Sequence, residues 1–328
     1  QEPPATNFAP PRPMPTINPP RNETVVAEQK LQNPRVENTD YTDHIVHLAR
    51  ALLGNIGPIS EKAHVEQRLA TMSRFAAGRK AWNAWSKEML EVRSLADTDP
   101  GLVAVCDALA KANFSGMRFT ESVDFAALIF PGRAEFSGSE FETDCWFQGA
   151  TFYGSATFRQ ASFLGETSFE RASFYGLVDF ANSLFMQPAQ FRQVQILGPA
   201  VFEHTDFTRG GWFSGCKFND VVFTNAHFGG ATAFTDSEFL GAATYAEAVF
   251  QASCGFEGAK FRKQAKLLQV EVGGAAWFQD AKFAQPPELA GMQVFGGGDV
   301  DVLLHTAKAG KHTNVNAQRG ITSRCDGS

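Results

Sequence analysis

Large apolar residues recur along the middle of the chain at alternating intervals of five and six residues. In the stretch ATFYGSATFRQASFLGETSFERASF, residues 150–174, phenylalanine stands at positions 152, 158, 163, 169 and 174. The same spacing runs from Phe114 to Leu289 through 33 positions, which we call beats, and 28 of them are Phe. The other beat residues are Ile196, Tyr245, Leu267, Val272 and Leu289, so none of them is charged. Two positions before a beat the residue is most often Ala, and otherwise mostly Ser, Thr, Cys, Gly or Val.

This spacing predicts very short strands that form the sides of a coil. Residues i−2 and i of an extended segment point to the same side, so each beat buries one small and one large residue. If four sides close one coil, the coil contains 22 residues and each strand pairs with the strand one coil earlier. The 33 beats then make about eight coils, which at ~4.8 Å per coil form a rod roughly 38 Å long.

The alternation fails at one place. The intervals from 218 to 223 and from 223 to 228 are both five residues. We therefore expect a missing corner residue and a locally tightened turn between residues 218 and 228.

Helical periodicity precedes the repeat. Residues 41–53 form a short amphipathic segment that ends at Gly54 and the Gly57-Pro58 break. Ser60 has the character of an N-cap for a longer helix, which Gly78 is expected to kink or split. The apolar positions of this helix recur at threes, fours and sevens: Val65, Leu69, Met72, Phe75, Trp82, Trp85, Met89 and Val92.

The repeat resembles the pentapeptide-repeat family, in a Phe-centred variant with an eleven-residue period. The resemblance covers about residues 112–289 and implies a right-handed quadrilateral β-helix. The expected fold class is mainly β, with an α-helical amino-terminal region and an extended Pro-rich arm. The expected domains are the Pro-rich arm at 1–40, a helical region at 41–111 that caps the solenoid, the β-helix at 112–300, and a polar tail at 301–328.

Both ends of the rod need protection, because a bare coil exposes unpaired strand edges. At the amino end, the predicted helix from Leu102 to Ala112 is the natural cap. At the carboxyl end, Val294 and Val300 keep the spacing after Leu289, which predicts one further partial coil.

Composition adds limits rather than a function. The chain is 44% hydrophobic, which excludes disorder of the whole, and its net charge of −6 gives no reason to expect binding to nucleic acid or anionic lipid. No apolar run is long enough to cross a membrane. Nine prolines within residues 1–34 favour an extended, polyproline-like arm. The chain begins with Gln1 instead of Met, which favours a processed, exported or organelle-targeted protein.

Candidate catalytic and metal-binding residues are sparse. Cys145, Cys216 and Cys254 occupy small inward positions and are interpreted as core residues, and five cysteines do not suggest a disulfide framework. His44 and His47 have helical i, i+3 spacing but lack a third ligand nearby. No nucleophile elbow, phosphate loop or carboxylate pair is present. We expect no enzyme activity, no metal or other cofactor and no small-molecule ligand.

The outward positions carry the candidate contact residues. Trp146, Trp212 and Trp277 each precede a beat by one and are separated by three coils, so they are predicted to face one side. Tyr153 and Tyr175 lie one coil apart at the position after a beat, and Leu197 and Leu240 continue that column. Aligned exposed aromatics of this kind favour protein docking. A basic group, Lys260, Arg262, Lys263 and Lys266, is interpreted as a solvated face.

Three functions remain open at this point. The first is a non-catalytic scaffolding subunit that binds protein partners, through the rod faces, helical region and extended termini, within a larger assembly. The second follows from the family resemblance and is inhibition or protection of DNA gyrase by mimicry of duplex DNA. Mimicry needs a strongly acidic surface, whereas residues 112–289 contain 19 acidic and 12 basic side chains. The third is a secreted effector or surface protein, which only the missing initiator Met supports.

Overall fold

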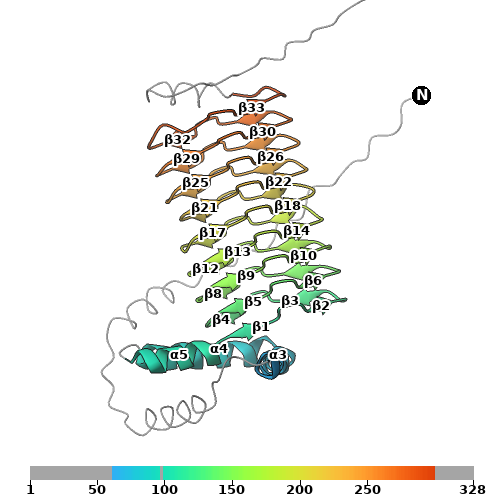
Figure 1. The fold of residues 1–328 in the computed structure, drawn as a ribbon, viewed down its shortest axis with the longest axis vertical. Helices are drawn as coiled ribbons and strands as arrows, with labels where there is room; N and C mark the ends of the chain where they lie inside the picture. The colour runs from blue at the N-terminus through green and yellow to red at the C-terminus, as the bar shows by residue number, and fades with distance from the viewer. Residues whose placement is uncertain (1–60, 97–98, 300–328) are drawn as a thin grey trace, which may run out of the picture. The chain divides into compact units, whose positions relative to one another are not determined.

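The computed structural model describes residues 61–96 and 99–299, which form three helices followed by a stack of short parallel strands (Figure 1). The helices are α3 (Glu61–Ala76), α4 (Arg79–Leu95) and α5 (Pro100–Leu109). Each of the strands β1 to β33 contains two residues, and consecutive strands belong to different sheets. This arrangement is a parallel β-solenoid with four sheets and about eight coils, as the spacing of the beats predicts.

Each sheet is one side of the solenoid, and its strands come from successive coils. We name the sheets A to D in the order in which the chain visits them. Sheet A contains β1 (Ala112–Asn113), β5 (Ala134–Glu135), β9 (Ala156–Thr157), β13 (Val178–Asp179), β17 (Ala200–Val201), β21 (Val221–Val222), β25 (Ala243–Thr244) and β29 (Ala265–Lys266). Sheet B contains β2 (Arg118–Phe119), β6 (Glu140–Phe141), β10 (Ser162–Phe163), β14 (Leu184–Phe185), β18 (Asp206–Phe207), β22 (His227–Phe228), β26 (Val249–Phe250), β30 (Glu271–Val272) and β33 (Gln293–Val294).

The other two sides are built in the same way. Sheet C contains β3 (Val123–Asp124), β7 (Cys145–Trp146), β11 (Thr167–Ser168), β15 (Ala189–Gln190), β19 (Gly211–Trp212), β23 (Thr232–Ala233), β27 (Cys254–Gly255) and β31 (Ala276–Trp277). Sheet D contains β4 (Ile129–Phe130), β8 (Thr151–Phe152), β12 (Ser173–Phe174), β16 (Gln195–Ile196), β20 (Lys217–Phe218), β24 (Glu238–Phe239), β28 (Lys260–Phe261) and β32 (Lys282–Phe283).

The beat residues form the core of the solenoid. Every beat from Phe125 to Phe278 is buried. Rings one coil apart lie nearly parallel, with centroids from 4.4 Å apart for Phe130 and Phe152 to 5.2 Å for Phe218 and Phe239. Rings of the same coil can meet edge to face, as Phe158 and Phe169 do at 5.4 Å and 85°. The core is therefore a set of aromatic columns parallel to the axis, in which both favourable ring geometries occur.

The five-plus-six period reflects two kinds of corner. In a five-residue interval, which turns from sheet A to B or from C to D, the second residue after the beat is left-handed. In the corner after Phe158, for example, Gln160 has φ 55° and the amide of Ala161 donates to the Phe158 carbonyl at 3.0 Å. Six-residue intervals turn from B to C and from D to A through three residues. An eleven-residue unit is thus one tight corner and one wide corner.

The predicted irregularity is confirmed. Between β20 and β21 the wide corner from sheet D to sheet A contains two residues, Asn219 and Asp220, instead of three. Sheet A nevertheless keeps its ladder, because Ala200 pairs with Val221 and its amide donates to the Asp220 carbonyl at 2.8 Å. The Asp220 side chain accepts a further hydrogen bond from the Ala242 amide at 2.8 Å. The missing residue therefore shortens only the corner and leaves the strand pairing of sheet A unchanged.

The aromatic side chains that cover the first coil come from α3 and α4. The rings of Phe75 and Trp82 lie 5.7 and 6.0 Å from that of Phe114, and the Trp82 indole donates to the Ile129 carbonyl at 2.7 Å. Both helices belong to the region 41–111 that is expected to cap the solenoid. The predicted helix from Leu102 to Ala112 corresponds to α5, which contacts α4 through the Arg93–Asp107 ion pair and leads the chain into β1.

Details of the helical region also differ from the expectation. Gly78, with φ 86°, separates α3 from α4, so the predicted split is confirmed. Val65 and Leu69 are exposed by 49% and 64%, so only the later part of the predicted apolar face meets the core. Helix α5 starts at Pro100, two residues earlier than expected, because Asp99 accepts hydrogen bonds from the first amides. Ser60 and the segment 41–53 lie outside the described residues.

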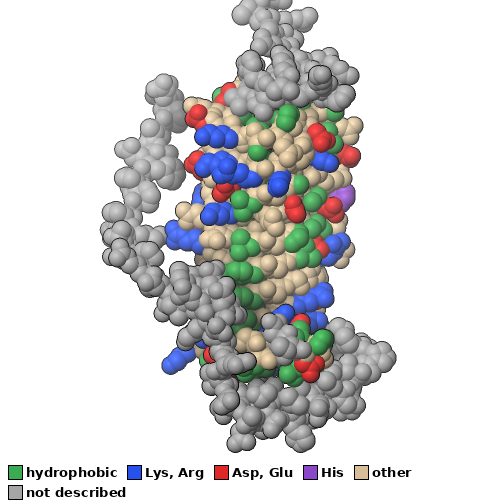
Figure 2. All heavy atoms as spheres, turned by 90° about the vertical axis from the view of Figure 1, so that its left-hand side faces the viewer, with side chains coloured by type: hydrophobic (Ala, Val, Ile, Leu, Met, Phe, Trp, Pro, Cys, Tyr) green, Lys and Arg blue, Asp and Glu red, His purple; other side chains and the backbone are tan. Residues whose placement is uncertain are grey.

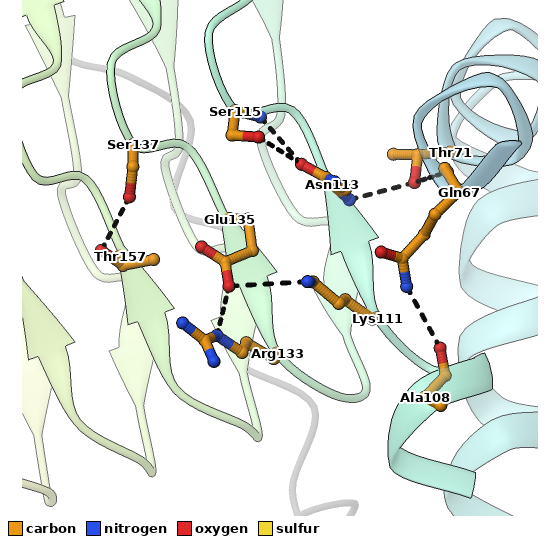
Figure 3. Close-up of polar contacts among 10 residues, drawn as sticks. All are labelled: Gln67, Thr71, Ala108, Lys111, Asn113, Ser115, Arg133, Glu135, Ser137 and Thr157. Atoms are coloured by element: carbon orange, nitrogen blue, oxygen red, sulfur yellow. Dashed lines mark hydrogen bonds and ion pairs between the residues drawn. The ribbon is translucent and has the colours of Figure 1, made fainter. Parts of the chain in front are cut away.

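Polar groups join the helices to the open edge of the first coil (Figure 3). The Asn113 amide, which has no preceding coil to pair with, donates to the Thr71 hydroxyl at 3.0 Å. Glu135 is largely buried and lies between Lys111 and Arg133, with its Oε1 3.7 Å from the lysine Nζ. The hydrogen bond to Thr71 satisfies the backbone amide of Asn113, which would otherwise be free to pair with a strand of another molecule. At the other end β33 pairs with β30, which confirms the expected partial coil as far as Val294, whereas Val300 is not described.

Tyr245 is a beat residue with a polar group, its phenol hydroxyl, inside the apolar core. Its hydroxyl is buried and has no hydrogen-bond partner among the residues that the structure describes. We expect Tyr245→Phe to raise the free energy of unfolding by about 1 kcal/mol, because an unsatisfied buried hydroxyl is costly. Urea unfolding at neutral pH measures this. The exposed Tyr153→Phe is the control and should leave stability unchanged, whereas a less stable Tyr245→Phe protein would contradict the assignment.

The same residue predicts a pH dependence. Burial raises the pKa of Tyr245 well above its ordinary value. The folded protein therefore holds this proton more tightly than the unfolded chain, so the neutral phenol's contribution is complete below about pH 10 and declines as pH rises beyond it. We expect wild-type stability to fall above pH 10 and Tyr245→Phe to reduce that slope. An equal slope in the two proteins would show that the phenol is not responsible.

The corner at 219–220 predicts a difference between two insertions. One glycine inserted between Asn219 and Asp220 restores the wide corner and should cost less than about 1 kcal/mol. The same insertion between Arg159 and Gln160 disrupts a tight corner and its hydrogen bond, and should cost at least about 2 kcal/mol. Urea unfolding of both proteins tests this. Equal losses would show that the two corner types do not differ in tolerance.

Candidate protein-interaction surfaces

Exposed apolar side chains gather at the corner between sheets D and A. Figure 2 views this side of the solenoid and shows hydrophobic side chains in a line along the rod. Five of them are between 39% and 43% exposed, and with the exposed Pro199 they form what we call the apolar stripe: Tyr153, Tyr175, Leu177, Leu197, Pro199 and Leu240. An apolar surface that continues over several coils differs from the scattered exposed residues common on soluble proteins.

The wide corner explains how the stripe is built. Its first residue gives Tyr153, Tyr175 and Leu197 in successive coils, and its third gives Leu177 and Pro199. The second residue is glycine in each of these coils. A Cβ on Gly198 would lie 2.2 Å from the carbonyl oxygen of Gly176, so the approach of consecutive coils excludes a side chain there. The stripe therefore consists of two rows of apolar groups on either side of a row of glycines.

Tyr153 and Tyr175 stack on each other at the amino-terminal part of the stripe. Their ring centroids are 5.0 Å apart and the rings are inclined by 5°. Partial burial, and to a smaller extent the neighbouring Tyr175, raises the pKa of Tyr153. The Tyr153 phenol therefore remains neutral at physiological pH. The outward positions of sheet D beside them are the uncharged Thr151, Ser173 and Gln195.

Toward the carboxyl end the residues in the column of the stripe become polar and then basic. Asn219 replaces an apolar residue in the fourth of these coils and donates its Nδ2 to the Leu197 carbonyl at 3.0 Å. Leu240 follows, and the next residue in the column is Arg262. Arg262 donates to Glu238 at 2.8 Å and lowers the pKa of that carboxyl, and Lys263 comes next in the chain. The apolar stripe thus leads into a basic region on the same corner.

The three tryptophans occupy one column on the outer face of sheet C. The registers of β7, β11, β15, β19, β23, β27 and β31 place Trp146, Trp212 and Trp277 in line. The column positions between the tryptophans carry no aromatic residue: Ser168 and Gln190 follow Trp146, and Ala233 and Gly255 follow Trp212. Trp277 is 44% exposed, whereas Arg192 lies over the ring of Trp212 at 5.3 Å. The tryptophans and the tyrosines lie on different sides of the solenoid, so they do not form one surface.

The cysteines that the repeat places inward are core residues. Cys145, Cys216 and Cys254 are at most 1% exposed and carry free thiols. Burial raises the pKa of Cys216 and Cys254 to about 12 and that of Cys145 well above its usual range. Because the reactive form of cysteine is the thiolate, these groups are unsuited to nucleophilic chemistry.

The described part of the chain can be compared with the requirements of a metal site and of a membrane-spanning helix. Within residues 61–96 and 99–299 no three His, Cys, Asp or Glu side chains gather in a way that could hold a metal ion. His44 and His47 lie outside those ranges. None of the described helices combines the length and the apolar character needed to span a bilayer.

Sequence reasoning found one row of the stripe and missed the other. It identified Tyr153, Tyr175, Leu197 and Leu240 as a column, but it did not include Leu177 and Pro199. These two residues stand three positions after a beat; in a tight corner that position is the inward small residue, as Ala161 is, and in these wide corners it is an exposed residue. The alternation of the intervals was therefore a usable signal, since it marks which corners have a third residue.

The central coils of the solenoid match a known protein family. The family model described as pentapeptide repeats (9 copies) matches residues 147–195, 180–224 and 213–260. No curated protein matches the chain. The matched segments contain the stripe from Tyr153 to Leu240 and also Trp212, whereas Trp146 and Trp277 lie outside them.

The buried thiols lead to a prediction about reactivity. We expect iodoacetamide to leave Cys145, Cys216 and Cys254 unmodified in the folded protein near pH 8, because their raised pKa values and burial suppress the thiolate. All three should react once urea unfolds the chain. Peptide mapping by mass spectrometry identifies the modified sites. Rapid modification of any of the three in the folded protein would contradict their assignment to the core.

Proposed function

Because the repeat region at residues 147–260 belongs to the pentapeptide-repeat family, we propose that this protein is a non-catalytic scaffold that binds protein partners along its rod. The observation that carries the proposal is the apolar stripe. Its side chains are exposed, contiguous over the coils from Tyr153 to Leu197, and attached to a backbone that is hydrogen-bonded on both sides. A rigid surface of this kind loses little conformational entropy on binding.

The energetic argument favours association. Burying apolar area contributes roughly 25 cal/mol per Å², and aromatic residues are enriched among the side chains that dominate binding. The stripe provides two tyrosines and three leucines on one corner. Trp277 on sheet C is a separate exposed aromatic side chain. Because neighbouring tryptophans lie three coils apart, their column would be a second contact surface only for a partner that spans at least three coils.

The charges do not favour mimicry of DNA. The outward strand positions of sheet D toward the carboxyl end are Lys217, Glu238, Lys260 and Lys282, so that side is mainly basic. Sheet C presents Asp124 as its acidic strand position, together with the tryptophans. Replacement of duplex phosphates needs a continuous negative surface, which these columns lack. The partner of this rod is therefore proposed to be a protein.

Co-purification tests the proposed function. We expect the tagged wild-type chain to retain specific proteins from an extract of its native source and Tyr175→Ser/Leu177→Ser to lose them. Met186→Ser is the matched control, because Met186 is 40% exposed on the opposite corner, between sheets B and C. Quantitative mass spectrometry compares the three samples. Partners that are retained equally by all three would refute binding through the stripe.

A further inference from the structure

The repeat distance of the stripe restricts the conformation of its ligand. Successive members of the column lie one coil apart, about 4.8 Å, and the two tyrosine rings are 5.0 Å apart. A polyproline II helix repeats every three residues over about 9.3 Å, which matches two coils at about 9.6 Å. An α-helix advances about 5.4 Å per turn and is out of step by half a coil after about four turns. A polyproline II ligand therefore stays in register with alternate coils, such as those of Tyr153 and Leu197.

The chemistry of the stripe suits the same ligand. Between Tyr153 and Pro199 the corners from sheet D to sheet A contain tyrosine, leucine, proline, serine and glycine and no ionised group. Proline rings pack on aromatic and aliphatic side chains, and the polyproline II backbone keeps its carbonyls in water. Such a ligand needs few hydrogen bonds from the surface. The row of glycines, which contributes no side chains, lies between the two rows that would hold the proline rings.

The basic residues at the carboxyl end of this corner indicate that the ligand carries acidic side chains there. Arg262 is five coils from Tyr153 in the same column, which corresponds to about 24 Å. At about 3.1 Å per residue a polyproline II segment covers this distance in about eight residues. Acidic side chains about eight residues from the first anchoring proline would therefore meet Arg262 and Lys263. Residues 1–21 of this chain, which contain eight prolines, carry Glu2, Arg12 and Arg21, so their net charge is positive and does not complement Arg262 and Lys263.

We propose that the apolar stripe binds a partner's proline-rich segment in the polyproline II conformation, with acidic residues at the end that faces Arg262 and Lys263. The proposal rests on the scaffold function and specifies the chemistry of the partner. The apolar rows supply affinity, and the basic end fixes the direction in which the segment lies.

Fluorescence anisotropy with the full chain tests this. The probe is a labelled peptide, APPAPPAPPEE, and its matched controls are APPAPPAPPKK and the proline-free AGGAGGAGGEE. We expect saturable binding of the first peptide and at least about tenfold weaker binding of both controls. Tyr175→Ala/Leu177→Ala should weaken binding of the first peptide about tenfold, whereas Met186→Ala on the opposite corner should change it less than twofold.

The contribution of charge has its own variants. Lys263→Ala should weaken binding about threefold at about 50 mM salt, and the difference should disappear near 0.5 M salt. Lys87→Ala on α4 removes the same charge at the other end and should have no effect. Because Tyr175, Leu177 and Lys263 are exposed, these variants should fold, which circular dichroism checks.

Several results would overturn the proposal. They are the absence of saturable binding, equal binding of the lysine-ended peptide, and equal or tighter binding of an amphipathic α-helical peptide. A dimer in sedimentation that Tyr175→Ala/Leu177→Ala dissociates and Met186→Ala preserves would identify a second copy as the occupant. If co-purified partners depend on the stripe but the peptide does not bind, the scaffold function stands and the polyproline II ligand is refuted.

Discussion

The structure depends on the hydrogen-bonded contact between consecutive coils. Strands of two residues have no stability of their own, so each is held by the backbone hydrogen bonds above and below it, at the ladder spacing of about 4.8 Å. That spacing is also the distance at which phenyl rings stack, and the observed centroids of 4.4 to 5.2 Å show that both requirements are met together. Ladder and core therefore stabilise each other along the whole rod.

Stacking at this spacing extends to the surface. Any residue type that recurs at one corner position becomes a row of side chains one coil apart, as the stacked Tyr153 and Tyr175 demonstrate. The same close approach forces glycine into the middle of the wide corner, where a Cβ would meet the preceding coil. A functional surface on this fold is thus a periodic one, and its period selects ligands whose own repeat is commensurate with it.

The ends of the rod follow a different physical rule. The first coil has no predecessor, so the helices take its place. Thr71 accepts the hydrogen bond of the Asn113 amide, and Phe75 and Trp82 bury the ring of Phe114. These contacts join elements with unrelated periodicities, and no single spacing in the sequence describes them. The five-plus-six spacing therefore does not specify which helical side chains cover the first coil, and the exposure of Val65 and Leu69 does not follow from the helical periodicity alone.

The sequence by itself determined the fold of the repeat, the inward columns and even the short corner at Asn219–Asp220, because in a solenoid each residue's place follows from counting along the chain. It also placed the tryptophans on one side and one row of the stripe. Only the tertiary structure decided that the two rows meet on either side of the glycines, that Arg192 covers Trp212, and which helices close the rod. Those features arise from corner geometry and from packing between unlike elements, which the repeat distance alone does not specify.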